Sequence, residues 1–474
     1  MKHTVRSTLL CLGTGVVVQR VLQLVSFLIV GHTLGVAGLG VYAEGMAVAA
    51  VLAVVAGAGV RNLVARAVSR QPDAAGVLVG HAVHMRLLVG VTLAIVAAML
   101  AFVGSTRPWF WLLCVLHVVP AAFDLKNLVD AAGRTRGEVV LDASAAVLQL
   151  ALIGVWSTTA EPRLEVLAGI SLGCRAIYAV GAILSIRRLP ALREPDHKPV
   201  GLNAVGAGQT AHELLAIGDV ALVAMVAGDV AAGYYAVAVR FAAAAMLPSA
   251  QLARLLLPHL LHAQQNGDAT RTFATALRAT LWLTAPVCAG GLVVADQLCA
   301  LSGDGFAVSG HVLRLLLFAG ICQHVGWQCS HALLAAGRDR AYANGLLWPA
   351  TLHAAALATL WLAPTLAPDL GGAGQATLAA TAAALAQAGY LCCSLWAMHC
   401  GPAFARALLA PTVAALATAG AASLPVDWLA TSLQLPMRLA SGAAAFVLVL
   451  WLLELRGRLR HVGDGLATSS GFGS

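Results

Sequence analysis

Residues 9–43 read LLCLGTGVVVQRVLQLVSFLIVGHTLGVAGLGVYA. The apolar run from Leu9 to about Leu34 is too long for the hydrophobic region of a signal peptide, and no small-residue cleavage site closes it. About 20 mostly apolar residues are enough for a helix to span a bilayer. We therefore predict an uncleaved first transmembrane helix, a glycine-rich turn and a second span.

The composition extends this prediction to the whole chain. Of 474 residues, 60% are hydrophobic and 11% are charged, whereas soluble domains are about half apolar and a quarter charged. This excludes an ordinary soluble domain and a disordered chain. We predict an all-α, polytopic membrane protein with about fourteen spans, near residues 9–32, 39–60, 76–103, 108–129, 138–158, 164–186, 202–227, 231–257, 273–297, 308–333, 340–363, 371–398, 404–424 and 436–455.

The basic residues predict the orientation. With the N-terminus in the cytoplasm, the inside segments hold nineteen Lys and Arg residues and the outside segments only three. Cytoplasmic loops carry such an excess, so both termini are predicted to be cytoplasmic. The net charge of +8 is scattered rather than gathered on one face, which argues against a nucleic-acid partner. The ten cysteines show no ligand spacing, so we expect no metal site and no cofactor.

An internal repeat divides the chain. Residues 37–43 (AGLGVYA) recur as residues 230–236 (VAAGYYA), with Tyr42 and Tyr235 separated by 193 positions. Residues 131–136 (AAGRTR) recur as residues 335–340 (AAGRDR) at an offset of 204. Six spans per repeat imply a parallel repeat about an axis along the membrane normal. The predicted parts are an N-lobe (1–186), a cytoplasmic linker (187–201), a C-lobe (202–398), and two extra C-terminal helices with a tail (399–474).

These motifs resemble those of a known family. Two six-span lobes, Leu34-Gly35 before the glycine-rich turn, and Gly-Arg-x-Arg after the fourth span resemble the multidrug/oligosaccharidyl-lipid/polysaccharide (MOP) exporter superfamily. With Arg20 in the first span, the chain looks like a Wzx-type polysaccharide flippase. The resemblance implies a monomer in the bacterial inner membrane that moves a polyprenyl-diphosphate-linked oligosaccharide between leaflets. It also implies work beside a polysaccharide polymerase or other assembly proteins.

Ionisable residues within the spans indicate where the site lies. An arginine at the bilayer centre costs about 2.5–3.5 kcal/mol on insertion scales, so these side chains should face protein or water. A planar guanidinium also grips a phosphate through two hydrogen bonds. We predict a cationic cavity between the lobes that binds the diphosphate and sugar head. Its predicted cations are Arg20, Arg86, Arg175, Arg240 and Arg314.

Carboxylates inside the spans are predicted to serve in gating or coupling. They are Glu213, Asp219, Asp124 and Asp142. The offset between Tyr42 and Tyr235 also places Arg20 and Glu213 at equivalent positions, so they could oppose each other as a switchable ion pair. Equally, Glu213 could pair with Arg240. The spacing does not choose between Na⁺, protons and membrane potential as the driving force.

Two other functions stay open. A drug or organic-cation antiporter of the same superfamily would favour an acidic cavity, which the excess of arginine opposes. A membrane-embedded glycan polymerase or transferase would normally carry a large outer loop, and no predicted outer loop exceeds roughly fifteen residues. We therefore expect a transporter and not an enzyme.

Overall fold

The computed structural model describes residues 2–57, 64, 74–124, 135–159, 161–186, 204–250, 252, 260, 263, 269–359, 371–398, 411, 414–419, 421–423 and 433–449. These residues form helices and connecting turns, with no strand among them. The helices are α1 (Lys2–Gly57), α3 (Ala75–Gly104), α4 (Pro108–Leu116), α5 (Val118–Ala121), α7 (Thr135–Ser157), α8 (Leu164–Ile186), α9 (Ala204–Ala245), α11 (Ala269–Val293), α12 (Ala295–Ala300), α13 (Gly310–Ala335), α14 (Asp339–Thr359) and α16 (Gly372–Met398), with the 3₁₀ segment η2 (Asp304–Ser309) before α13.

Eight of the described helices are long and apolar enough to cross a membrane. Two shorter apolar helices, Pro108–Ala121 and Leu433–Val449, add to them. The prediction of an all-α polytopic membrane protein is therefore confirmed. The count of fourteen spans stays a prediction, since α1 and α9 each hold two predicted spans in one continuous element.

Both α1 and α9 turn at a single glycine. Gly35 has φ +66° and Gly228 has φ +80°, and each interrupts an otherwise helical run. A positive φ is accessible to glycine at little cost and strained for other residues. The separation of the two glycines equals that of Tyr42 and Tyr235, as the sequence repeat predicts.

The second arms of α1 and α9 cross at two further glycines. A Cβ atom on Gly40 would overlap the carbonyl oxygen of Asp229, and one on Gly233 would overlap the carbonyl oxygen of Val36. The repeat offset that relates Gly40 to Gly233 also relates Val36 to Asp229. Each contact is therefore the repeat-related copy of the other, as expected across a two-fold axis.

The second repeated motif also has a structural counterpart. Helix α7 begins at Thr135 and α14 at Asp339, and the separation of these two positions equals the offset of the motif. In the second copy, Gly337 (φ +71°) makes the turn between α13 and α14. Its counterpart in the first copy lies outside the described residues. The repeat that the sequence predicts is thus present in the backbone at both landmarks.

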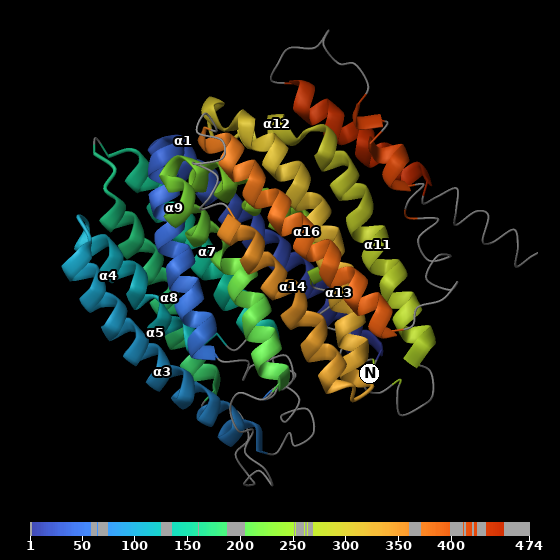
Figure 1. Cartoon of the computed structure of the whole chain (residues 1–474), viewed down its shortest axis with the longest axis horizontal. Helices are drawn as coiled ribbons and strands as arrows, with labels where there is room; N and C mark the ends of the chain where they lie inside the picture. Colours follow the sequence, from blue (N-terminus) through green and yellow to red (C-terminus); the bar gives the residue numbers. More distant parts are fainter. Residues whose placement is uncertain are drawn as a thin grey trace, which may run out of the picture.

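The helices pack as two groups joined mainly by α1 and α9. Helices α1, α3, α4, α5, α7 and α8 form the N-terminal group, and α9, α11, α12, α13, α14 and α16 form the C-terminal group. In Figure 1 they lie on opposite sides of the molecule, in blue to teal and in green to orange. The predicted linker, residues 187–201, and much of the region 399–474 lie outside the described residues, so the predicted domain limits stay predictions.

Candidate functional site

Helices α1 and α9 bring two of the predicted cations together. The exposed side chain of Arg20 donates from Nη1 to Oε1 of Gln23 over 3.1 Å. Arg240 is also exposed, and its guanidinium carbon lies 5.2 Å from the centre of the Phe27 ring. The charges of Arg20 and Arg240 act on each other, and Tyr42 acts on Arg240. Two accessible guanidinium groups therefore lie where the two helix groups meet.

Such a placement has a chemical consequence. Both arginines belong to apolar, membrane-length elements, where a charge facing lipid is costly. The Phe27 ring shields one face of the Arg240 guanidinium in a cation–π contact and leaves its side chain accessible. An arginine held in this way keeps N–H donors available for an anionic ligand.

Arg86 has a different environment. From α3 it donates to two backbone carbonyl oxygens, those of Ala121 and Asp124, each over 2.9 Å. These carbonyls end α5, where the last turn of a helix has no partners of its own. Arg86 thus ties α3 to the end of α5, and the predicted carboxylate Asp124 contributes its backbone oxygen to this contact.

Three other predicted residues lie on separate helices. Arg175 is exposed on α8, and its charge acts on His117 between α4 and α5. Asp142 is buried on α7, and Glu213 is half-buried on the first arm of α9. The opposition of Arg20 and Glu213 stays a prediction.

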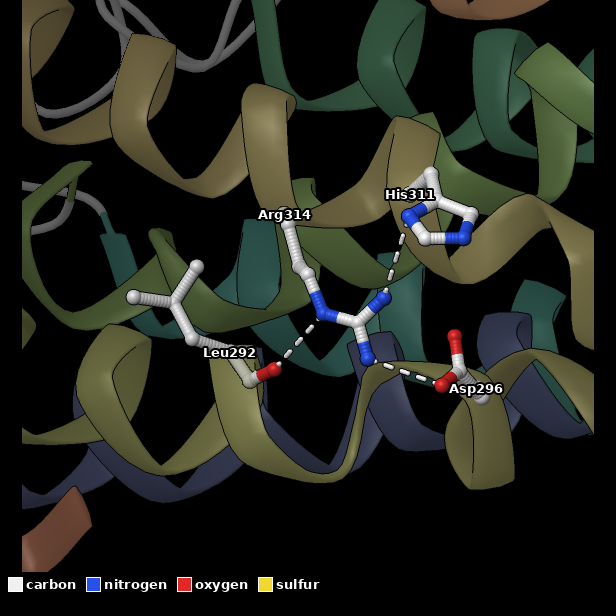
Figure 2. A network of polar contacts seen from close by, with 4 residues as sticks. All are labelled: Leu292, Asp296, His311 and Arg314. Carbon is white, nitrogen blue, oxygen red and sulfur yellow. Dashed lines mark hydrogen bonds and ion pairs between the residues drawn. The ribbon is translucent and has the colours of Figure 1, made fainter.

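The remaining predicted cation, Arg314, joins three helices (Figure 2). Its Nη2 donates to Oδ2 of Asp296 over 2.8 Å and its Nε to the carbonyl oxygen of Leu292 over 3.0 Å, while Nη1 lies 3.5 Å from Nδ1 of His311. Leu292 is near the end of α11, Asp296 begins α12, and Arg314 lies on α13. The guanidinium therefore clamps the break between α11 and α12 against α13, a structural arrangement unlike that of Arg20 and Arg240.

A buried polar cluster lies in the C-terminal group. The hydroxyl of Tyr235 donates to Oδ2 of Asp219 over 2.9 Å, and Nε2 of His353 on α14 lies 3.2 Å from Oδ1 of the same carboxylate. The three residues are between 0% and 7% exposed, so solvent hardly reaches them. An ionisable group is thus held in the core of this helix group by two polar partners.

The equivalent tyrosine of the N-terminal group has a neutral partner. Tyr42 is the repeat counterpart of Tyr235, and its hydroxyl is 3.0 Å from Oγ of Ser171 on α8. Both tyrosines are buried. The repeat therefore preserves the tyrosine, and only the C-terminal copy joins it to a carboxylate.

Sequence reasoning finds Asp219 but misses three of the residues around these sites. Tyr235 stands out in the sequence only as a landmark of the repeat. His353 stands alone in an alanine-rich helix, and Asp296 lies 18 positions before Arg314 across a helix break, so neither has a spacing that indicates its partner. The only available signal is the recurrence of Tyr235 with an acidic residue 16 positions before it.

Comparison with known proteins gives a result for structures only. No family model matches the chain, and no curated protein does. The lipid II flippase MurJ, in an inward closed conformation, matches with a TM-score of 0.60 at 12% identity, over 93% of this chain and 98% of that one. This chain has the fold of MurJ and the MATE transporters.

Two further structures support that statement. A MOP superfamily transporter from Pyrococcus furiosus matches with a TM-score of 0.60 at 15% identity, over 83% of this chain and 95% of that one. The Vibrio cholerae MATE transporter VcmN matches at 0.58 and 16% identity, over 82% and 95%. The predicted resemblance to the MOP superfamily is confirmed at the level of the MurJ/MATE fold, and these matched structures are of transporters.

Proposed function

We propose that this protein is a transporter that flips a polyprenyl-diphosphate-linked oligosaccharide from the inner to the outer leaflet of a bacterial inner membrane. The observation that carries the proposal is the pair Arg20 and Arg240, accessible at the contact between the two helix groups. A diphosphate brings at least two negative charges, and guanidinium groups bind phosphate oxygens through charge-assisted hydrogen bonds. Because the two cations come from different helix groups, one head group could bridge them.

The physical obstacle is the polar head of such a lipid. Each hydroxyl taken into hydrocarbon without a hydrogen-bond partner costs about 4–8 kcal/mol on a water-to-alkane scale. A hydrated passage between the helix groups removes that cost, while the polyprenyl tail stays in the bilayer. Alternating access then requires only that the two groups rock against each other about the α1–α9 crossing.

The comparisons support this proposal through the fold. MurJ is described as a lipid II flippase, so the fold accommodates a lipid-linked glycan. The Pyrococcus furiosus transporter is described by a binding pocket of reverse polarity that suggests a different function, so pocket charge varies within the fold. A cationic pair at the seam favours an anionic cargo over the cationic cargo of a drug antiporter.

Purified protein in liposomes tests the proposal. We expect undecaprenyl diphosphate to bind, and a fluorescent oligosaccharide on that lipid to become accessible to an external quencher. Arg20→Gln and Arg240→Gln should each weaken binding by on the order of 10-fold or more, since a hydrogen bond to a charged group contributes about 1.5–3 kcal/mol. Arg163→Gln, at an arginine whose side chain is 71% exposed, is the matched control and should bind normally.

The same liposomes separate the alternatives. Efflux of ethidium without any flipping would indicate the organic-cation antiporter. Recovery of an oligosaccharide of altered length would indicate a glycan polymerase or transferase. Undiminished binding of undecaprenyl diphosphate by both Arg20→Gln and Arg240→Gln would reject the proposed role of these arginines.

A further inference from the structure

The buried cluster in the C-terminal group contains an ionisable pair that anion binding does not use. Asp219 is 7% exposed and His353 is 2% exposed, and both lie on membrane-length helices. An isolated carboxylate in such surroundings is costly, whereas a carboxylate that shares a proton with a neighbouring imidazole is tolerated. Oδ1 of Asp219 and Nε2 of His353 lie 3.2 Å apart but are not aligned as a hydrogen bond. A position for a proton therefore exists between them.

The neighbouring charges are few and come from identified helices. Tyr235 of α9 and His353 of α14 are the groups that act electrostatically on Asp219. From the first arm of α9, His212 acts on His353. Helices α13 and α16 supply Trp327 and Tyr390, which contact His212.

Helix α1 contributes an apolar neighbour at this level. Val51 lies 3.4 Å from the place that a Cβ on Gly218 would take. The pair is thus enclosed by aromatic, imidazole and apolar groups. No arginine or lysine acts on the carboxylate among the described residues.

The donor set suits a proton better than a metal cation. Hard cations are held by several oxygen ligands, and this site offers one carboxylate, one phenol that donates to it, and an imidazole nitrogen. Within the described part of the chain, no group of three or more His, Cys, Asp and Glu side chains could hold a metal ion. One carboxylate beside one imidazole needs only a proton to be neutralised.

The pair is connected to the element that carries Arg240. Asp219 lies on the arm of α9 before Gly228, and Tyr235 lies on the arm after it, so their 2.9 Å hydrogen bond ties the two arms together. Arg240 follows Tyr235 on the second arm, little more than one helical turn further on. A proton on Asp219 removes the charge that the Tyr235 hydroxyl serves, and so changes how the second arm is held.

We propose that Asp219 and His353 form a proton-binding site, and that uptake and release of one proton there shifts the equilibrium between conformations of the transporter. The proton comes from the aqueous side to which the site is open, forms an O–H or N–H bond on the pair, and returns to water on the other side. No other bond is made or broken. The coupling role rests on the proposed flipping function, but proton binding itself does not.

Infrared spectroscopy of the purified full-length protein tests proton binding without any lipid substrate. A carboxylic acid C=O band that titrates with pH should be present in the wild type, absent in Asp219→Asn, and shifted in its titration midpoint in His353→Gln. Asp304→Asn, at an exposed acid in η2, is the matched control and should leave the band intact. A band that persists in Asp219→Asn, or a midpoint unmoved by His353→Gln, would overturn the proposal.

Flipping in liposomes then tests the coupling. A pH gradient should accelerate flipping by on the order of 10-fold, the usual size of coupling between two sites. That acceleration should be lost in both Asp219→Asn and His353→Gln, and a Na⁺ gradient at constant pH should have no effect. Acceleration by Na⁺ alone, or a full pH response in both variants, would contradict the proton site. If Asp219→Asn does not fold, Tyr235→Phe takes its place, and an unaltered band and pH response there would count against the proposed link.

Loss of the proposed function has a different signature. A wild-type protein that shows the titrating band but never flips the lipid would leave the proton site intact and reject the flippase. A protein that flips the lipid without the band would do the opposite.

Discussion

The two helix groups share a backbone plan and differ in the chemistry placed on it. Gly35 and Gly228 break their helices at equivalent positions, and Gly40 and Gly233 make reciprocal contacts. Yet Tyr42 meets a serine hydroxyl, whereas its counterpart Tyr235 meets the carboxylate of Asp219. The repeat therefore fixes where the helices turn and cross, and leaves the polar partners free to diverge.

The distribution of charge follows the same division. Three of the five predicted cations, Arg20, Arg86 and Arg175, lie in the N-terminal group, while the buried carboxylate–imidazole pair lies in the C-terminal group. Arg240, on α9, is the cation that the C-terminal group brings to the seam. This asymmetry suits a protein that binds an anion at the seam and responds to protons in one half only.

The largest expected effect tests the shared backbone plan. Gly40→Val and Gly233→Val each place a side chain where a backbone carbonyl of the partner helix lies. We expect each variant to lose about 1–3 kcal/mol or more of stability, because overpacking forces the helices apart. Thermal unfolding in detergent measures the loss.

A matched variant controls for valine itself. Gly154→Val, on α7, meets no atom within 4 Å of the added Cβ and should cost much less. A large loss in Gly40→Val with none in Gly233→Val would break the two-fold equivalence of the crossing.

The next effect tests the divergent partners. Tyr235→Phe removes the only hydroxyl that donates to Asp219 within the part of the chain that the structure describes, and losing a hydrogen bond to a charged group costs about 1.5–3 kcal/mol. Tyr42→Phe removes a bond between two neutral hydroxyls, which contributes about 0.5–1.5 kcal/mol. The unfolding temperatures of the two variants measure the difference. Equal losses would show that Asp219 is neutral and that the two halves do not differ in this respect.

These comparisons also show what the sequence can and cannot predict. The apolar runs, the positions of the breaks and the internal repeat are all predictable, because helix length and glycine conformation are local properties. The partners of Arg314 and Asp219 are not, because they depend on how separate helices rotate and pack. Asp296 and His353 have no periodic pattern that marks them, since each acts through one contact from another element.

The smallest expected effect compares one ion pair from each group. Arg314 pairs with Asp296 at 2.8 Å with side chains 31% and 52% exposed, whereas Arg163 pairs with Glu161 at 3.5 Å with side chains 71% and 81% exposed. Exposed pairs contribute about 0–1 kcal/mol because water and salt screen them. We expect Arg314→Gln to lower stability by up to about 1 kcal/mol and Arg163→Gln to change it hardly at all.

The salt dependence of the Arg314 effect identifies its origin. Raising the ionic strength to about 1 M shortens the screening length to about 3 Å, so the charge contribution of Arg314 should shrink. The hydrogen bond from Arg314 to the carbonyl oxygen of Leu292 should persist and keep part of the difference from Arg314→Gln. If the whole difference vanished in high salt, the guanidinium would be acting on Asp296 alone, and the break between α11 and α12 would be held by other contacts. If instead Arg314→Gln reduced binding of undecaprenyl diphosphate as strongly as Arg20→Gln, the site would extend from the seam to α13.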